Sequence, residues 1–252
     1  MPSILRSSRR SSTITQAEIK EVRALREKKF RDAYGLFVVE GEKMVQEALL
    51  SDFEVVHVWR RDEIGEAAMA RISQLSTPSP VLAVVARPEP AGLVVERGLY
   101  LGLDGVRDPG NMGTILRIAD WFGVRTVFVS DDCVDLYNPK VIQSSMGSIF
   151  RVRVVTADLA DLARRFREAG MRVYGTFLDG KNLYQETLVP EGLVLMGNEA
   201  AGIRPEVAAE VDARLLIPSF GQSARETGAG TGAESLNVAV ATAVTLSEFR
   251  RR

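Results

Sequence analysis

Short apolar runs alternate with amphipathic segments along almost the whole chain. The apolar runs are bounded by glycine, proline or small polar residues, as buried strands usually are. The segments between them carry apolar residues at helical spacing. The predicted strands cover residues 35–41, 53–61, 80–88, 98–106, 125–132, 151–156, 172–179, 192–199 and 213–219. The predicted helices cover residues 15–31, 42–51, 63–76, 111–124, 138–150, 157–170 and 236–251.

This alternation predicts an α/β protein with more than one layered domain. From residue 98 onward, apolar strands separated by helices predict a mostly parallel sheet that is covered on both faces. The segment 87–98 contains prolines and a shift in composition, as linkers do. We therefore expect a disordered basic tail over 1–13, a small α/β domain over 14–92 and a larger domain over 93–252.

The composition is that of an ordinary globular protein, with 46% hydrophobic and 26% charged residues. No apolar run approaches the ~18 residues of a membrane span, and the N-terminus lacks the apolar centre of a secretory signal. Cys133 is the only cysteine, so we expect no disulfide, no metal site and a reducing cytoplasm as the compartment. His57 is the only histidine and lies in an apolar strand, so we expect it to pack there.

The net charge of −1 hides an uneven distribution along the chain. Residues 1–31 contain nine basic and three acidic side chains, a balance of 9 − 3 = +6, which leaves −7 for the remainder. A basic end of this kind either contacts a polyanion such as RNA or forms the solvated face of a helix. Charge alone leaves both interpretations open.

Polar residues follow several of the predicted strands, where ligands bind in open α/β sheets. Asp108-Pro109-Gly110 predicts a turn, Asn111 a helix cap, and Arg117 lies further along that helix. Gly197 and Glu199 follow the apolar run LVLM at 193–196. Ser235 and Asn237 precede the last helix. Each group also has a purely structural interpretation as a turn or a cap, and the residues alone do not decide between the two. The stretch GAGTG at 228–232 follows polar residues rather than a strand, and no dinucleotide or phosphate-binding motif occurs.

Together these segments resemble the SpoU (TrmH-type) family of RNA ribose 2′-O-methyltransferases, in the SPOUT superfamily. DGVRDPGNMGTILRIADWFGV is similar to the first family motif, LVLMGNEAAGI to the second, and LLIP with ESLNVAVATAV to the third. The segment FVVEGEKMVQEAL resembles the ribosomal-protein-like α/β domain that binds the RNA substrate in the family. The resemblance runs from about residue 12 to the C-terminus, and three motifs in the family's order make it specific.

The resemblance implies a trefoil knot in the C-terminal domain, an S-adenosylmethionine pocket formed by the knotted loops, and a homodimer. It implies RNA as the substrate, with ribosomal RNA ahead of transfer RNA, and neither a metal nor a membrane. The cofactor-binding positions that it implies are Thr176, Gly197, Ile217 and Leu236. The functional polar positions that it implies are Asn111, Arg117, Glu199, Ser235 and Asn237.

The implied reaction is direct displacement, in which a ribose 2′-hydroxyl attacks the sulfonium methyl group. The family mechanism gives proton removal to Arg117, which reaches the partner subunit's cofactor. A guanidinium has a pKa above ~12 and is a poor base, so Arg117 could instead clamp the neighbouring phosphate. The chain departs from the family in the long loop 221–234, interpreted as a lid, an RNA contact through Arg225 or a neutral excursion. The competing functions are a non-catalytic RNA-binding protein and a nicotinamide-dependent oxidoreductase.

Overall fold

The computed structural model describes residues 13–89, 92, 95–220 and 235–251. The chain forms two compact units. One contains residues 1–90 and 135–151, and the other contains residues 91–134 and 152–252. The predicted tail, apart from Thr13, and the predicted long loop 221–234 lie outside the described residues.

The first unit is built on a three-stranded antiparallel sheet with the order β1-β3-β2. Its alternating apolar residues point to opposite faces, as the two-residue period of a strand requires. The strands are β1 (Leu36–Glu40), β2 (Val55–Arg60) and β3 (Val81–Ala86), and the helices are α1 (Gln16–Ala24), α2 (Lys28–Tyr34), α3 (Glu42–Leu49), α4 (Arg61–Ile64), α5 (Glu66–Ile72), α7 (Pro139–Ser145) and the 3₁₀ turn η2 (Ser148–Phe150).

The two faces of this sheet have different cores. Leu36 and Val38 lie in one cluster with residues of α1 and α5, including Ile19. Phe37 lies 4.7 Å from Tyr137 and 6.5 Å from Phe150, measured between ring centroids. The segment 135–151 therefore completes the second face, although the sequence assigns it to the domain over 93–252.

The helix predicted over 15–31 is divided into α1 and α2. Its start is as expected, because Thr15 and Glu18 form a reciprocal capping box. Arg31 was expected among the basic residues of an exposed face, but only 2% of its surface is exposed. Its guanidinium donates hydrogen bonds to the carbonyls of Leu25 (2.8 Å) and Arg26 (2.7 Å), which stabilises the chain where the predicted helix is interrupted.

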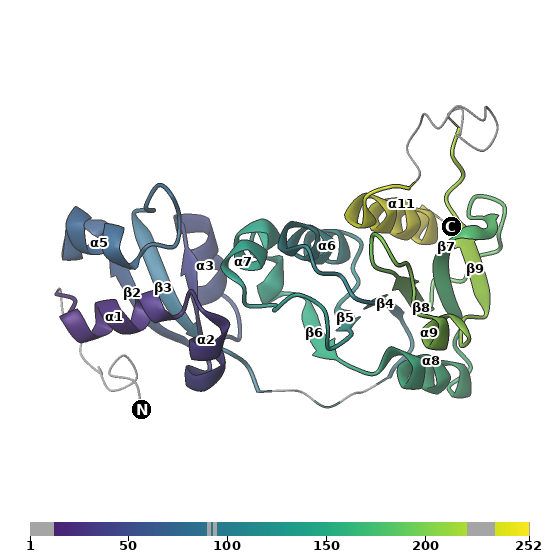
Figure 1. Ribbon diagram of the computed structural model, residues 1–252, viewed down its shortest axis with the longest axis horizontal. Helices are drawn as coiled ribbons and strands as arrows, with labels where there is room; N and C mark the ends of the chain where they lie inside the picture. Colours follow the sequence, from purple (N-terminus) through teal and green to yellow (C-terminus); the bar gives the residue numbers. More distant parts are fainter. Residues whose placement is uncertain (1–12, 90–91, 93–94, 221–234, 252) are drawn as a thin grey trace. The chain divides into compact units, whose positions relative to one another are not determined.

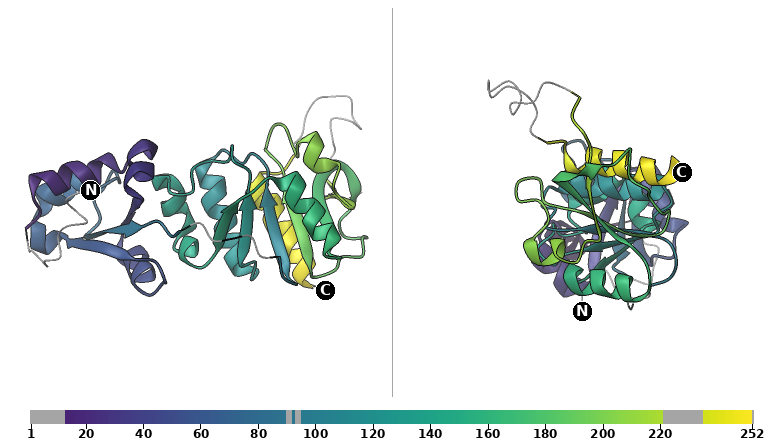
Figure 2. Two further views of the ribbon diagram at one scale, coloured as in Figure 1. Left: turned by 90° about the horizontal axis from the view of Figure 1, so that it is seen from below. Right: turned by 90° about the vertical axis from the view of Figure 1, so that its right-hand side faces the viewer.

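The second unit contains a parallel six-stranded sheet with the order β6-β5-β4-β8-β7-β9. Helices α6 and α11 cover one face and α8 and α9 cover the other (Figures 1 and 2). The strands are β4 (Leu99–Leu103), β5 (Thr126–Val129), β6 (Arg153–Thr156), β7 (Val173–Asn182), β8 (Gly192–Met196) and β9 (Ala213–Leu216). The helices are α6 (Pro109–Trp121), α8 (Leu159–Glu168), α9 (Pro205–Ala208) and α11 (Val238–Arg251).

Helices α6 and α11 are fastened to each other and to the sheet. The Arg250 guanidinium in α11 donates to the carbonyl of Phe122 (2.7 Å) at the end of α6 and to that of Gly123 (3.2 Å). Phe249 packs edge-on against Tyr174 of β7, with ring centroids 4.8 Å apart. These contacts fix both helices, and thereby the residues at their N-terminal ends.

The parallel α/β sheet and the smaller α/β unit confirm the predicted fold class. The trefoil knot remains a prediction from the resemblance. In the described part of the chain, no helix is both long and apolar enough to cross a membrane.

Candidate active site

Three side chains from distant segments meet in one hydrogen-bonded chain. The Asn111 amide Nδ2 donates to Glu199 Oε1 at 2.6 Å. Asn237 Nδ2 donates to Asn111 Oδ1 at 2.9 Å. Asn111 lies in the first turn of α6, Glu199 in the loop after β8, and Asn237 directly before α11. The structure therefore brings together one predicted polar residue from each of the three motifs.

The cap of α6 differs from the prediction. Asp108 is the capping residue, and its Oδ1 accepts the backbone N–H of Asn111 at 2.8 Å. The predicted turn 108–110 is the cap and first turn of the helix, with Pro109 at its first position. Because Asp108 supplies the cap, the Asn111 side chain is left to bond Glu199 and Asn237.

Asn237 has both of the roles that the sequence left open. Its Oδ1 accepts the backbone N–H groups of Ala239 (2.9 Å) and Val240 (3.3 Å), which caps α11. Its Nδ2 is the group that bonds Asn111. One amide thus satisfies the helix end with its oxygen and joins the candidate site with its nitrogen.

The loop after β8 makes a close turn on itself. Asn198 and Gly202 form an isolated antiparallel bridge. A Cβ atom at Gly197 would lie 2.2 Å from the carbonyl carbon of Gly202, so only glycine fits there. Asn198 Oδ1 accepts the backbone N–H groups of Ala200 (2.9 Å) and Ala201 (3.0 Å). The turn holds Glu199 at its outer edge, where the side chain is exposed.

The four predicted cofactor positions differ in their relation to the sheet. Gly197 and Ile217 directly follow β8 and β9, Leu236 lies two residues before α11, and Thr176 lies within β7. Thr176 in β7 is half-buried, and its hydroxyl lies 3.4 Å from the carbonyl of Leu195 at the end of β8. Ile217 follows β9 directly and is half-buried. Leu236 is 48% exposed. A backbone edge beside partly exposed apolar side chains suits the flat ring of an adenine nucleoside.

Arg117 and Ser235 are exposed and stand apart from the hydrogen-bonded chain. Among the described residues neither forms a side-chain hydrogen bond or an ion pair. The Arg117 guanidinium on α6 is therefore available to a ligand as far as the described chain is concerned. The structure also contains no group of three metal-ligating side chains within the described residues.

Three further residues surround the site and were missed by the sequence analysis: Asp104, Asn198 and Arg204. Asp104 directly follows β4 and is 1% exposed. Arg204 ends the loop after β8, and hydrogen bonds to Asp104 raise the pKa of its guanidinium. Hydrogen bonds from Ser130, which has the larger effect, and from Arg107 lower the pKa of the nearby Asp132 carboxyl. The available signal for Asp104 was an acidic residue directly after the apolar run LYLGL at 99–103.

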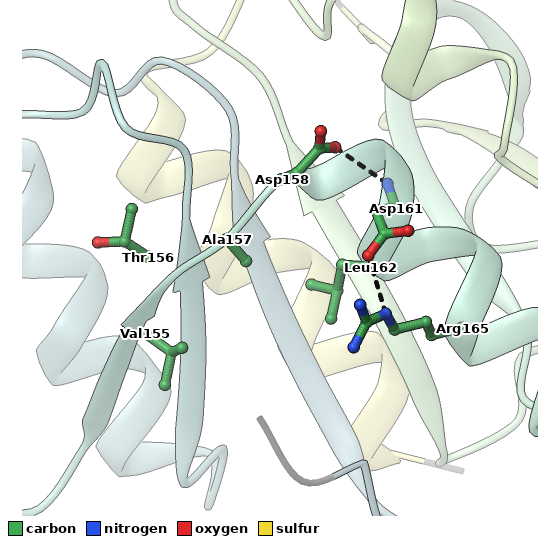
Figure 3. Close-up of a pocket in the computed structure, with 7 residues that line it drawn as sticks. All are labelled: Val155, Thr156, Ala157, Asp158, Asp161, Leu162 and Arg165. Carbon is green, nitrogen blue, oxygen red and sulfur yellow. Dashed lines mark hydrogen bonds and ion pairs between the residues drawn. The ribbon is translucent and has the colours of Figure 1, made fainter. Parts of the chain in front are cut away.

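A shallow hollow occurs elsewhere in this unit, beside the N-terminus of α8 (Figure 3). Its charged side chains already have partners. Asp158 caps α8 by accepting the N–H of Asp161 at 3.0 Å, and Asp161 pairs with Arg165 at 2.8 Å. None of the predicted site residues lines this hollow, so we do not assign it a function.

Comparison with known proteins gives matches over both parts of the chain. The model of the SpoU rRNA methylase family matches residues 98–247, and that of the MRM3-like substrate binding domain matches residues 16–65. The 23S rRNA (guanosine(2553)-2'-O)-methyltransferase RlmP of Bacillus subtilis is 34% identical over 249 residues, which cover 92% of this chain and 96% of that protein.

Two solved structures with bound S-adenosylmethionine are also similar. One is an rRNA methyltransferase from Sinorhizobium meliloti, with 30% identity, a TM-score of 0.83, and coverage of 95% of this chain and 97% of that one. The other is the SpoU methyltransferase AviRb from Streptomyces viridochromogenes, with 25% identity, a TM-score of 0.80, and coverage of 94% and 98%.

Proposed function

The chain belongs to the SpoU rRNA methylase family, and we propose that it methylates a ribose 2′-hydroxyl of ribosomal RNA with S-adenosylmethionine as methyl donor. The observation that carries the proposal is the convergence of Asn111, Glu199 and Asn237 beside the strand ends. The 34% identity to RlmP over nearly the full length of both proteins makes 23S rRNA the substrate to test first.

The reaction forms one bond and breaks one. The ribose 2′-oxygen bonds to the methyl carbon, the carbon–sulfur bond breaks, and the hydroxyl proton leaves. Products are a 2′-O-methylated RNA and S-adenosylhomocysteine. S-adenosylmethionine supplies a methyl group that is already activated by the positive sulfur. The protein's task is therefore to align the hydroxyl with that carbon and to receive the proton.

We assign cofactor binding to Thr176, Gly197, Ile217 and Leu236. Gly197 lies on a backbone edge where a side chain would collide with the loop, so its contact is through main-chain atoms. Ile217 and Leu236 offer apolar surface to the nucleoside ring. Calorimetry with S-adenosylmethionine tests the assignment, and NAD serves as the control ligand for the oxidoreductase alternative. Binding of neither would favour a non-catalytic RNA-binding protein.

We assign Arg117 to the phosphate next to the target ribose. Its guanidinium is exposed on α6, and a planar fork of donors matches a phosphate group. The neighbouring phosphate can then accept the hydroxyl proton, which a guanidinium itself does poorly. Asn111, Glu199, Ser235 and Asn237 orient the nucleotide. Arg117→Lys keeps the charge but loses the fork, so we expect it to retain RNA binding better than methyl transfer. Full activity of Arg117→Ala would contradict the assignment.

We also propose a homodimer formed through the second unit. Trp121 on α6 is 85% exposed and Val240 on α11 is 50% exposed. These two helices pack against each other, and a contiguous apolar patch on a surface commonly marks an interface. Sedimentation of the wild type and of Trp121→Glu tests this, with Leu50→Glu as control because Leu50 is 80% exposed in the other unit. A monomeric wild type would contradict the proposal.

A bacterial-type rRNA substrate would place the enzyme in the cytoplasm.

Mapping of ribose methylation across total RNA, with and without the gene, tests the function as a whole. We expect one 2′-O-methylated position in 23S rRNA to disappear when the gene is removed. Loss of a methyl group from transfer RNA would favour the alternative substrate. An unchanged map would contradict the proposed function.

A further inference from the structure

The Asp104 carboxylate forms an unusually complete contact with one residue. Asp104 follows β4 and is 1% exposed. Its Oδ2 accepts the backbone N–H of Arg204 at 2.8 Å, and its Oδ1 accepts Nε of the same residue at 2.7 Å. Arg204 Nη2 also lies 2.7 Å from Oδ1. Both the main chain and the side chain of Arg204 are therefore held by one carboxylate.

This contact has an electrostatic cause. Burial of a carboxylate costs free energy unless positively charged hydrogen-bond donors replace the lost water. The planar guanidinium of an arginine supplies several N–H donors in a fixed geometry. Asp104 is almost completely buried, whereas the Arg204 side chain is 40% exposed. Arg204 therefore supplies the partner that the burial of Asp104 requires. This contact holds the loop that carries Arg204 against the end of β4.

A second contact fastens the other end of the same loop. Asn198 Nδ2 donates to the carbonyl of Gly105 at 2.7 Å. The N–H of Gly105 in turn donates to Ser130 Oγ at 2.9 Å. The loop 198–204 is thus attached at its first and last residues to two successive residues, Asp104 and Gly105. Glu199 lies between these two attachments.

We propose that Asp104 is a positioning residue of the active site: through Arg204 it holds the loop 198–204 so that Glu199 meets Asn111. Asp104 does not itself touch the substrate. This inference rests on the proposed function for its effect on catalysis, but its geometric part does not. The effect of losing Asp104 should then depend on whether Glu199 is present.

A double-mutant cycle tests this dependence. We expect Asp104→Asn to lower kcat/KM by at least about tenfold, because a small misplacement of a group that orients the nucleotide is costly. In the Glu199→Gln background the same change should lower kcat/KM by less than about twofold, since the interaction that Asp104 supports is already lost. An equal factor in both backgrounds would overturn the proposal, because Asp104 would then support only the fold.

Amide hydrogen exchange tests the geometry without any reaction. In Asp104→Asn we expect exchange of the 198–204 amides to rise by at least about tenfold, as expected for a locally opened segment. The amides of α8 should be unchanged. Unchanged exchange in the loop, or an equal rise in α8, would overturn the proposal.

Two further variants complete the design. Arg204→Lys keeps the positive charge but loses the planar set of guanidinium donors. The amides of the loop 198–204 should therefore exchange at a rate between those of the wild type and Arg204→Ala. Asp161→Asn removes an acidic partner of the exposed Arg165 and serves as the matched control, with no effect expected on the loop. If the wild type transfers no methyl group to 23S rRNA, the proposed function fails, while hydrogen exchange still decides the role of Asp104.

Discussion

The Asn111 amide donates to Glu199 Oε1 at 2.6 Å, although the two residues are 88 positions apart in the chain. Asn111 simultaneously accepts a hydrogen bond from Asn237. An asparagine amide can donate and accept at once, which explains why this residue type lies at the centre. The three segments that resemble family motifs are therefore linked by side-chain chemistry as well as by position along the sheet.

Replacement of Asn111 should separate activity from stability. Asn111→Ala removes both bonds, and we expect kcat/KM to fall by about 100-fold, the scale of losing a preorganised polar group. The free energy of unfolding should change by less than ~1 kcal/mol, because Asp108 still caps the helix. Methyl-transfer kinetics and urea unfolding measure the two effects. A variant with full activity would contradict the role of the amide chain.

Asn237→Asp should divide the two functions of this residue. The carboxylate still accepts the N–H groups of Ala239 and Val240, so we expect α11 to remain capped within ~0.5 kcal/mol. It cannot donate to Asn111, and it adds a second negative charge beside Glu199. Methyl transfer should therefore fall strongly at neutral pH. Asn237→Ala should lose the cap as well, at a cost of about 1 kcal/mol by thermal unfolding.

Gly197→Ala should disturb the loop severely. The new methyl group would lie 2.2 Å from the carbonyl carbon of Gly202, and neither backbone segment can yield without moving the loop. We expect a loss of ~2 kcal/mol or more in stability together with weaker cofactor binding. Gly98→Ala is the control, because its methyl group would meet its nearest neighbour at 3.7 Å. Equal stability of the two variants would contradict this packing.

The buried pair Arg31–Asp135 should matter more than the exposed pairs near it. Nη2 of Arg31 lies 2.5 Å from Oδ2 of Asp135, with 3% and 13% of the two side chains exposed. Arg31→Met leaves a largely buried carboxylate unpaired, at a cost of ~3–5 kcal/mol. Lys28→Met breaks an exposed pair and should cost less than ~0.5 kcal/mol. In a Trp121→Phe background, fluorescence of the buried Trp59 reports the unfolding of this unit. Similar losses in both variants would contradict the prediction.

His57 should make the first unit less stable in mild acid. Burial lowers its folded-state pKa below the ordinary 6.5, because the imidazolium is poorly solvated beside Trp59. The unfolded chain therefore binds more protons between the two pKa values. The contribution of neutral His57 to the free energy of unfolding is complete above pH 6.5, and it falls as the pH decreases toward the folded-state pKa. Urea unfolding between about pH 5 and pH 8 should show this loss in the wild type and not in His57→Gln.

Local patterns predicted the elements well because strands and caps depend on neighbouring residues. The helix predicted from residue 138 begins there, for example, because Asn138 caps α7, with Oδ1 accepting the N–H of Lys140 at 2.9 Å. Asn111 was expected to cap its helix, but Asp108, three residues earlier, does so. Both residue types cap well, and the sequence alone gives no distance with which to choose.

Contacts between distant segments could not be predicted in this way. The partner of Asp104 is 100 residues away, and the polar groups that surround Arg31 include Asp135, 104 residues away. From sequence alone an arginine is predicted to lie on the surface, because arginine is seldom buried without a partner, and the partner is visible only in the folded structure. The resemblance to the family supplied the candidate site residues, but the bonds among them depend on the folded sheet.

Transfer of labelled methyl groups from S-adenosylmethionine to unmodified 23S rRNA is the most direct test of the central claim. After digestion of the RNA, we predict that the label elutes as a 2′-O-methylnucleoside and that Asn111→Ala reduces it by about 100-fold. Label on a base, or equal label with wild type and variant, would contradict the account.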